Sequence, residues 1–307
     1  MTGVSARAPH RFLVLLSTHN GARFLTEQVG SVLSQRGVAL HLHVRDDGST
    51  DETVNVLQGL AADNRLTYSE DECIGAAQSY LTILSETPRD VDYVALCDQD
   101  DVWIDGKLAR AAEWLSGLEG PAMYCSAVEV VDENLRSLGI HRTCRRGPSL
   151  ENALVQNIAT GCTIVLNRQA LHLFRRVPRQ PVMHDSWIYA VIAAAGTVRY
   201  DPSPWVLYRQ HESNTIGLAE SRAAQWVRRL GQHVATGGER VHTRQASELL
   251  ELLGSEIKPE SLATLTEFVL AQASVAGRVR YALTGPAFRQ RRVDSIIYRA
   301  LYLLGRI

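Results

Sequence analysis

Three carboxylate side chains lie within four residues, directly after an apolar run that ends at Cys97. They belong to Asp98, Asp100 and Asp101. Carboxylates this close repel one another, and a bound hard cation such as Mg²⁺ or Mn²⁺ relieves the repulsion through oxygen ligands. The surrounding residues lack the spacing of an EF-hand, which argues against a dedicated calcium loop. The cluster is therefore either a divalent-metal site or an acidic turn with solvated charges.

A second acidic pair, Asp46 and Asp47, follows alternating apolar residues that end at Val44. A carboxylate in this place can accept the imide N–H of a pyrimidine base, whereas Ser49 or Thr50 is expected to cap the helix that follows. The sequence contains neither a Gly-x-Gly-x-x-Gly loop nor a Walker loop. A bound metal, rather than a glycine-rich cradle, is therefore expected to hold phosphate groups.

Two further groups of polar residues could take part in chemistry. Asp185, preceded by His184, opens a predicted helix over 186–195, so it is either the N-cap of that helix or a general base. Arg209 and His211 follow a later predicted strand, and their side chains suit a diphosphate or a metal ion. Taken singly, each of these residues also has an ordinary structural role.

Alternating strands and helices position these residues. Apolar or alternating runs predict strands, and apolar residues at helical spacing predict helices. The alternation indicates an α/β fold with a mostly parallel sheet, helices on both faces, and ligands at the carboxyl ends of the strands. Three such ends carry the polar residues 17–20, 46–47 and 98–101. Strands are predicted over 12–16, 40–44, 66–68, 92–97, 122–127, 163–166, 198–200 and 205–208, and helices over 24–33, 53–60, 75–84, 186–195 and most of 219–307.

Composition excludes several classes of protein. Of 307 residues, 45% are hydrophobic and 21% charged, so the chain is not disordered. Lys and Arg total 32 against 33 Asp and Glu, which excludes the basic excess of a general nucleic-acid binder. No run of about 18 apolar residues predicts a membrane-spanning helix, and the run at 12–16 is too short for a signal peptide. Five widely spaced cysteines without a C-x-x-C pair favour a reducing compartment, so we expect a cytoplasmic protein, or one peripheral to the inner membrane face.

Taken in order, five segments resemble the family 2 glycosyltransferases, and more narrowly the rhamnosyltransferase-like members that build bacterial cell-surface polysaccharides. The segments are FLVLLSTHNG, VRDDGSTDET, ALCDQDDVW, MHDSWIYAVIAAAG and YRQHESNTIG, between residues 12 and 217. The resemblance implies a GT-A fold, in which a Rossmann-like nucleotide-binding sheet is joined to an acceptor-binding region. It also implies transfer of a sugar, with rhamnose one candidate, from a nucleotide diphosphate to a glycan or lipid-linked acceptor, with inversion and with Mn²⁺ or Mg²⁺.

On the donor side, the resemblance implies that Ser17, His19 and Asp47 hold the nucleoside, with Asp47 on the base. It implies that Asp98 contacts the ribose or the metal. The sequence departs from the family at His19, where Tyr is frequent, and at Gln78, where Asn is frequent. These departures affect base stacking and the donor-side contact of the helix that contains Gln78.

On the metal and acceptor side, the resemblance implies that Asp100 ligates the metal and that His211 binds metal or phosphate. The resemblance also implies that Asp185 is the catalytic base, which would take the proton from the acceptor hydroxyl. The remaining candidates are Asp101 at the metal, Arg209 at the phosphates, and Gly161 in a loop that resembles the lining of the acceptor pocket.

Two other classes of protein remain open. A nucleotidyltransferase would also use an α/β sheet with acidic metal ligands. It normally needs a glycine-rich or Lys/Arg-rich phosphate loop after the first strand, and residues 18–24 contain one Gly and one Arg. A catalytically inert nucleotide-sugar-binding module would use Asp185 only as a helix cap.

We expect two regions, a GT-A nucleotide-sugar-binding and catalytic domain over 1–217 and a helical, basic region over 218–307. The first 219 residues carry 19 basic and 25 acidic side chains, whereas the remainder carry 13 and 8. From residue 275 onward, seven arginines stand against one acid, Asp294. We expect this end of the chain to dock on the body or on a second copy, or to lie on the anionic inner leaflet. Three of its apolar residues share one predicted helical face: Ile297, Leu301 and Leu304.

Overall fold

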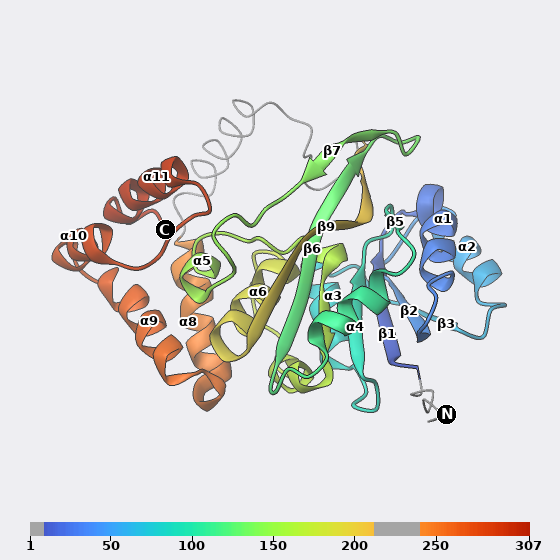
Figure 1. Ribbon diagram of the computed structural model, residues 1–307, viewed down its shortest axis with the longest axis horizontal. Coiled ribbons are helices and arrows are strands. Elements are labelled where there is room, and N and C mark those ends of the chain that lie inside the picture. Colours follow the sequence, from blue (N-terminus) through green and yellow to red (C-terminus); the bar gives the residue numbers. More distant parts are fainter. Residues whose placement is uncertain (1–8, 212–239) are drawn as a thin grey trace, which may run out of the picture.

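The computed structural model describes residues 9–211 and 240–307. The strands of these residues are β1 (Arg11–Thr18), β2 (Ala39–Asp46), β3 (Leu66–Glu70), β4 (Tyr93–Cys97), β5 (Val102–Trp103), β6 (Ala122–Val131), β7 (Ser137–His141), β8 (Val165–Asn167) and β9 (Thr197–Arg209). They form one nine-stranded sheet in the order β3-β2-β1-β4-β8-β6-β9-β5, with β7 paired to β6. Helices cover both faces of this sheet (Figure 1).

The helices fall into two groups along the chain. Those that flank the sheet are α1 (Ala22–Leu33), α2 (Thr53–Leu60), α3 (Ala76–Ser85), α4 (Lys107–Leu115), α5 (Leu150–Ala153) and α6 (His184–Ala195). Those nearer the C-terminus are α8 (Val241–Leu253), α9 (Pro259–Ala271), α10 (Val275–Thr284) and α11 (Arg292–Leu303). Short 3-10 helices are η1 (Gly161–Thr163), η2 (Arg168–Phe174) and η3 (Gly254–Glu256). Among the described helices, none is long and apolar enough to cross a bilayer.

The first half of the sheet is parallel, as the sequence predicts. Strand β1 pairs in parallel with β2 and β4, and β2 pairs in parallel with β3. Ser17 is level with Arg45 on β2, and Leu16 is level with Cys97 on β4. The three polar segments that follow these strands therefore meet at one edge of the sheet, where α/β folds bind ligands.

The second half of the sheet is mixed. Strand β8 pairs antiparallel with both β4 and β6, while β6 and β9 are parallel. The strands predicted over 198–200 and 205–208 belong to one long strand, β9, whose register against β6 shifts between Asp201 and Pro204. The prolines at 202 and 204 interrupt the alternation of apolar and polar residues there, so the sequence pattern divides the strand in two.

Two apolar cores hold the sheet between its helices. Phe12, Val14 and Leu16 on one face of β1 pack with α1, α2 and α4. Leu13 and Leu15 on the other face pack with α3 and α6. Each of these residues is at least nine-tenths buried, and full burial of such a side chain contributes about 1.5–3 kcal/mol. This sheet is a rigid support for the polar residues at its edge.

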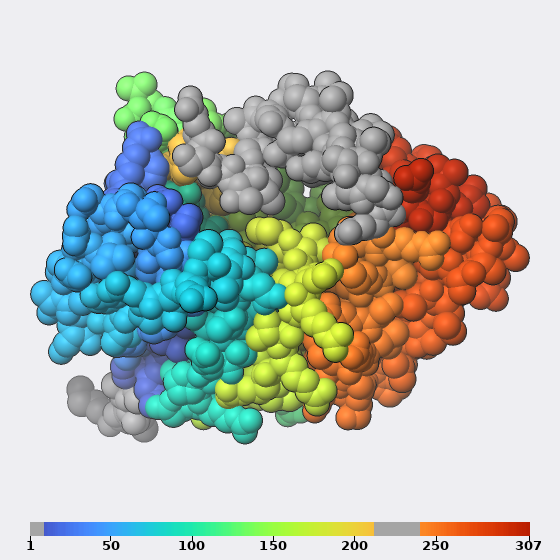
Figure 2. All heavy atoms as spheres, turned by 180° about the vertical axis from the view of Figure 1, so that it is seen from behind, coloured from blue at the N-terminus to red at the C-terminus, as the bar shows by residue number. Residues whose placement is uncertain are grey.

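Helices α8 to α11 form one end of the molecule beside α6 (Figures 1 and 2). Leu249, Phe268, Tyr281 and Tyr302, one from each helix, join the core that also contains Trp187 of α6. The helical prediction for this part of the chain is thus confirmed. The expected boundary near residue 217 falls between the described ranges, as do the predicted helical residues Trp226, Leu230 and Val234.

The inner face of α11 differs from the face that the sequence indicated. Tyr298 and Tyr302 are buried, whereas Leu304 is 69% exposed, and Ile297 and Leu301 are half-buried. The helix docks through its aromatic residues because they fill the space against Phe268, which spacing alone does not reveal. The five cysteines are all free thiols, as their spacing predicts.

Candidate active site

A buried polar network joins the ends of β1 and β2 to helix α3. The hydroxyl oxygens of Ser17 and Ser79 lie 2.6 Å apart, and Arg45 donates to Ser79 Oγ at 2.9 Å. Arg45 also donates to the carboxylate of Asp47. All four side chains are at least nine-tenths buried. Ser17 therefore lies inside this network, where it fixes α3 against the strand ends.

Asp47 holds a neighbouring loop through its carboxylate. It accepts the backbone N–H groups of Ile74 at 2.9 Å and Gly75 at 2.8 Å. Burial alone would raise the pKa of Asp47, but these hydrogen bonds and that from Arg45 lower it below the usual value, so the group is ionised. The ring Nδ1 of His19 lies 2.9 Å from the Asp47 carbonyl oxygen. His19 and Asp47, both expected at the nucleoside, are thus adjacent.

Gln99 links the first strand to the acidic loop. Its Oε1 accepts the Thr18 hydroxyl at 2.7 Å and the His19 N–H at 2.9 Å, and its Nε2 donates to the His19 carbonyl at 3.3 Å. Gly21 packs so close that a Cβ there would lie 2.5 Å from Gln99 Oε1. Gln99 is not evident as a functional residue in the sequence because an amide carries no charge. Its position between Asp98 and Asp100 is the one signal that points to it.

Tyr80 of α3 contacts the first residue of the acidic loop. Its hydroxyl lies 3.0 Å from Asp98 Oδ1 and donates to the Cys97 carbonyl oxygen at 2.6 Å. Burial and the nearby Asp100 charge raise the pKa of Asp98 to about 7, against the Tyr80 hydrogen bond, which lowers it. Burial and the Asp100 charge thus disfavour the ionised form of Asp98, which a bound cation would favour.

Asp100 pairs with His211, two residues beyond the end of β9. Its Oδ2 lies 2.8 Å from His211 Nε2, and the two side chains are 16% and 8% exposed. The His211 ring also lies against Phe24, with 5.0 Å between ring centroids. Two predicted metal ligands separated by more than 100 residues in sequence are thus neighbours.

Asp101 is buried and only half satisfied. Its Oδ1 accepts the backbone N–H of Arg209 at 3.1 Å, but its Oδ2 has no hydrogen-bond partner within the described residues. Ligand atoms of Asp98, Asp101 and Cys162 lie within 4.8 Å of one another. Burial, with the charges of Asp100 and Asp98, raises the pKa of Asp101 well above its usual range. An orphaned carboxylate oxygen in an acidic cluster fits a divalent cation, which would supply the missing partner.

Arg209 holds the backbone of the acidic loop in place. It is fully buried, and its Nε donates to the Asp100 carbonyl oxygen at 2.8 Å. Its other guanidinium nitrogens donate to the Glu133 carbonyl oxygen and the Glu27 carboxylate. The guanidinium also lies 4.6 Å from the ring centroid of Phe24. In this structure Arg209 contacts protein groups that fix Asp100.

A buried lysine lies behind the same loop. The Lys107 ammonium is 3.5 Å from the ring centroid of Trp103 and has no hydrogen-bond partner within the described residues. Burial lowers the pKa of Lys107 to about 8, although nearby acidic groups, Asp101 and Asp98 among them, oppose this shift. No sequence pattern distinguishes Lys107, because a lysine in the first turn of a helix is usually exposed to solvent.

Asp185 lies in the first turn of α6 and does not cap it. The N-cap is Met183, whose extended backbone (φ −154°, ψ 150°) precedes the first helical residue, His184. The alternative that Asp185 is the N-cap is therefore wrong. Burial raises the pKa of Asp185 to about 6, while hydrogen bonds from Ser186 N–H and from the Asn157 side chain lower it. Such a carboxylate is ionised near neutral pH and basic enough to take a proton.

His184 and Gly161 pack tightly beside Asp185. The rings of His184 and Tyr80 stack with 4.1 Å between centroids, and a Cβ on Gly161 would lie 2.6 Å from His184 Nε2. Neither ring nitrogen of His184 has a hydrogen-bond partner within the described chain. Burial lowers the pKa of His184 to about 3, so the imidazole is neutral. The predicted acceptor loop at Gly161 thus lies against the residue that precedes Asp185.

Gln78, the departure noted in α3, connects that helix to the segment before α6. Its Nε2 donates to the carbonyl oxygens of Pro178 and Arg179, each at 3.0 Å. The structure thus brings the candidate residues into two connected groups. One surrounds Ser17, His19 and Asp47, and the other runs from the acidic loop through Tyr80 to Asp185.

Comparisons with known proteins identify the family of the chain. Residues 13–174 match the model of glycosyl transferase family 2. The dTDP-rhamnosyl transferase RfbG of Shigella flexneri is 25% identical over 230 residues, which cover 69% of this chain and 77% of RfbG. The UDP-Glc:alpha-D-GlcNAc-diphosphoundecaprenol beta-1,3-glucosyltransferase WfgD of Escherichia coli is 28% identical over 164 residues, which cover 52% of this chain and 62% of WfgD.

Solved structures with related folds include two nucleotide-sugar complexes. Residues 1–349 of Staphylococcus aureus TarS in complex with UDP-GlcNAc align with a TM-score of 0.59 at 14% identity, covering 97% of this chain and 81% of that fragment. The mannosyltransferase PcManGT from Pyrobaculum calidifontis in complex with GDP-Man and Mn²⁺ aligns with a TM-score of 0.51 at 20% identity. The alignment covers 98% of this chain and 86% of the PcManGT chain. The chain therefore belongs to glycosyl transferase family 2 and has the GT-A fold.

Proposed function

We propose that the chain is an inverting, metal-dependent glycosyltransferase that moves a sugar from a nucleotide diphosphate to a hydroxyl of a glycan or lipid-linked acceptor. The observation that carries the proposal is the contact of Tyr80 with both halves of the site. Its hydroxyl bonds Asp98 of the acidic loop, and its ring stacks on His184, next to Asp185. The Tyr80 side chain thus lies between the acidic loop, where a cation would bind, and the proposed base Asp185.

The nucleoside is expected at the ends of β1 and β2. Of the residues expected to hold it, His19 is exposed there, whereas Ser17 and Asp47 are buried in the polar network beside it. Asp47 is ionised and can accept an N–H from a base, and it already holds the loop at Ile74. Asp98, at the adjoining strand end, is suited to the ribose or to the metal.

The diphosphate is expected beside Asp100 and His211. Their side chains would hold Mn²⁺ or Mg²⁺, and Asp101, whose Oδ2 has no partner within the described residues, lies with Asp98 in the same acidic loop. When bound, such an ion supplies Lewis-acid stabilisation of the charge on the departing diphosphate. Arg209 supports this arrangement by holding the Asp100 carbonyl oxygen in place.

Asp185 is the proposed base. The acceptor oxygen forms a bond to C1 of the sugar while the C1–oxygen bond to the diphosphate breaks. The acceptor proton passes to the Asp185 carboxylate, and the electron pair of the broken bond leaves with the nucleoside diphosphate. A single displacement of this kind inverts the anomeric centre, through a transition state with oxocarbenium character. Gly161, against His184, is expected to line the acceptor pocket.

Similarity to RfbG supports a rhamnose donor as the first to test. The decisive measurement mixes the protein with Mn²⁺ and a panel of nucleotide sugars and follows release of free nucleoside diphosphate. An inverting transferase releases the diphosphate and, with an acceptor present, gives a product whose anomeric configuration is opposite to that of the donor by NMR. Release of pyrophosphate from nucleoside triphosphate and sugar phosphate would instead identify a nucleotidyltransferase. Tight binding without turnover across the acceptor panel would identify an inert binding module.

A further inference from the structure

Helices α10 and α11 dock on the molecule through a cluster of tyrosines. Tyr281 and Tyr302 stack with 4.6 Å between ring centroids, and Tyr298 lies edge-on against Tyr302. The Tyr302 hydroxyl donates to the Phe268 carbonyl oxygen at 2.8 Å. These contacts bury the inner faces of the two helices. Both helices also carry apolar residues that are exposed on their outer faces.

The outer faces of α10 and α11 carry apolar stripes. We call this outer surface the C-terminal apolar face. On α10 it repeats every four residues, and on α11 it runs at helical spacing on the side away from Tyr298 and Tyr302. Of the 13 large apolar side chains exposed in the described chain, seven belong to this face. They are Val275, Val279, Leu283, Val293, Ile296, Leu303 and Leu304, between 40% and 73% exposed.

Arginines border this face. Arg291 and Arg292 are exposed at the start of α11, and Arg306 is exposed just beyond its end. From residue 275 onward the only acid is Asp294. Arg299, in contrast, points inward and donates to the carbonyl oxygens that end α10, so it holds the two helices together. The exposed surface thus combines apolar stripes with several exposed arginines.

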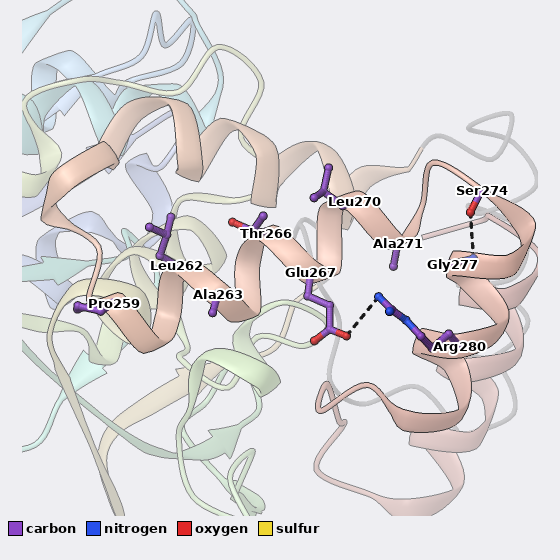
Figure 3. Close-up of a pocket in the computed structure, with 10 residues that line it drawn as sticks. All are labelled: Pro259, Leu262, Ala263, Thr266, Glu267, Leu270, Ala271, Ser274, Gly277 and Arg280. Atoms are coloured by element: carbon purple, nitrogen blue, oxygen red, sulfur yellow. Dashed lines mark hydrogen bonds and ion pairs between the residues drawn. The ribbon is translucent and has the colours of Figure 1, made fainter.

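A groove between α9 and α10 is distinct from the C-terminal apolar face. The groove has a volume of about 640 Å³ and is lined partly by the exposed side chains of Leu262 and Leu270. Figure 3 shows Arg280 reaching from α10 toward Glu267 on α9, and their charged atoms lie 3.9 Å apart. None of the seven residues of the C-terminal apolar face lines this groove, so the groove is separate from the face.

We propose that the C-terminal apolar face lies on an anionic lipid bilayer, with its apolar stripes among the acyl chains and its arginines at the headgroups. Helices that lie in a membrane interface combine an apolar face with basic borders in this way. A second copy of the chain is a poorer occupant. A two-fold contact of this face with itself would bring arginine borders together with only Asp294 to offset them.

Vesicle co-sedimentation of the full chain, without donor or acceptor, tests this surface independently of the proposed function. We expect binding to phosphatidylcholine vesicles that contain phosphatidylglycerol, little binding to phosphatidylcholine alone, and weakening by salt. Replacing Arg291→Gln and Arg292→Gln together is expected to lower the partition coefficient about 25-fold, at about fivefold for each arginine. Leu283→Ser with Ile296→Ser is expected to abolish binding to both vesicle types.

Matched variants elsewhere on the surface are the controls. Arg36→Gln with Arg199→Gln removes two exposed charges far from α10 and α11 in sequence, and Leu138→Ser removes an exposed apolar residue of β7. These variants should bind vesicles as the parent chain does. A parent chain that stays in the supernatant at low salt, or binds both vesicle types equally, would overturn the proposal. So would a dimer in sedimentation velocity that Leu283→Ser with Ile296→Ser converts to monomer.

Discussion

The ring of Tyr80 lies against the ring of His184, with 4.1 Å between centroids and 28° between the ring planes. The Tyr80 hydroxyl at the same time bonds the Asp98 carboxylate at 3.0 Å and the Cys97 carbonyl at 2.6 Å. One residue of α3 therefore contacts both the acidic loop after β4 and the first turn of α6. The position of the proposed base relative to the acidic loop depends on this contact.

Tyr80→Phe tests this relationship because it keeps the stacked ring and removes the hydroxyl donor. The Tyr80 hydrogen bond lowers the pKa of Asp98, so its loss should raise that pKa further above about 7. We expect weaker binding of nucleoside diphosphate with Mn²⁺ at pH 7 in calorimetry, with recovery at higher pH.

The matched control is Tyr189→Phe, which also removes a buried hydroxyl, here one bonded to the Ser149 carbonyl at 3.1 Å. Either change should lower the free energy of unfolding by about 1–3 kcal/mol, because buried partners lose a hydrogen bond. Only the change at Tyr80 should alter binding. Equal binding by both variants would show that Tyr80 acts through packing alone.

Asp185→Asn should remove the base and leave donor binding unchanged. A general base is typically worth about 10²- to 10⁴-fold in rate, and the amide cannot take the acceptor proton. In the parent chain the rate should fall as the pH drops below about 6, because the pKa of Asp185 is raised to that value and only the ionised form is active. Turnover near the parent rate, with normal donor binding, would assign the base to another carboxylate.

The same variant should also change how the stability of the protein depends on pH. Burial raises the pKa of Asp185 above the value of 3.8 expected when unfolded, so the folded state holds this proton more tightly. Its stabilising contribution is complete below about pH 4 and is lost as the pH rises through about 6. Asp185→Asn does not titrate, and we expect it to lose less stability than the parent between pH 4 and pH 7 in chemical denaturation. A parallel pH dependence in both proteins would contradict the burial of this carboxylate.

Asp100→Asn should weaken metal-dependent binding without unfolding the site. Arg209 contacts the backbone carbonyl of Asp100, not its carboxylate, so the loop keeps its main support. We expect calorimetry to show weaker Mn²⁺ and nucleoside diphosphate binding, and chelation of metal by EDTA to reduce parent turnover to the level of the variant. Asp105→Asn, four residues from the candidate ligand Asp101 and exposed, is the control. Unchanged affinity and rate in Asp100→Asn would exclude it as a ligand.

Local patterns were enough to predict the edge of the sheet that carries the site. Continuous apolar runs identified β1 and β4, and alternating apolar residues identified β2. In each case the strand ends in polar residues, which must emerge at the edge of the sheet. The candidate residues at these ends, such as Asp47 and Asp98, are therefore visible in sequence. The antiparallel strand β8 is short and pairs with strands that are distant in sequence. Its direction therefore cannot be predicted from the sequence.

Contacts between distant segments account for what the sequence did not reveal. The guanidinium of Arg209 bonds Glu27, 182 residues away, and no periodicity predicts such a pair. The role of Gln99 depends on β1 lying beside β4, which brings Thr18 within 2.7 Å. Likewise, the buried side of α11 is decided by the shape of its docking site around Phe268 and not by the apolar spacing of the helix.

The close approach of Gly161 to His184 gives the last prediction. A Cβ at position 161 would lie 2.6 Å from His184 Nε2, and Tyr80 blocks the ring from its stacked face. Gly161→Ala must therefore displace His184 or the loop, at a cost of about 1–3 kcal/mol. Because the Gly161 backbone also bonds Asp185, turnover should fall as well.

Two further variants separate this clash from the intrinsic effect of alanine. Gly30→Ala in α1 is the control, since no atom lies within 4 Å of the new methyl group, and it should be stabilising by about 0.5–1 kcal/mol. His184→Ala leaves a cavity that the added methyl group can partly fill, so the double variant Gly161→Ala with His184→Ala should be more stable than the sum of the single changes predicts. Strict additivity in the double-mutant cycle would show that the two residues do not press on each other.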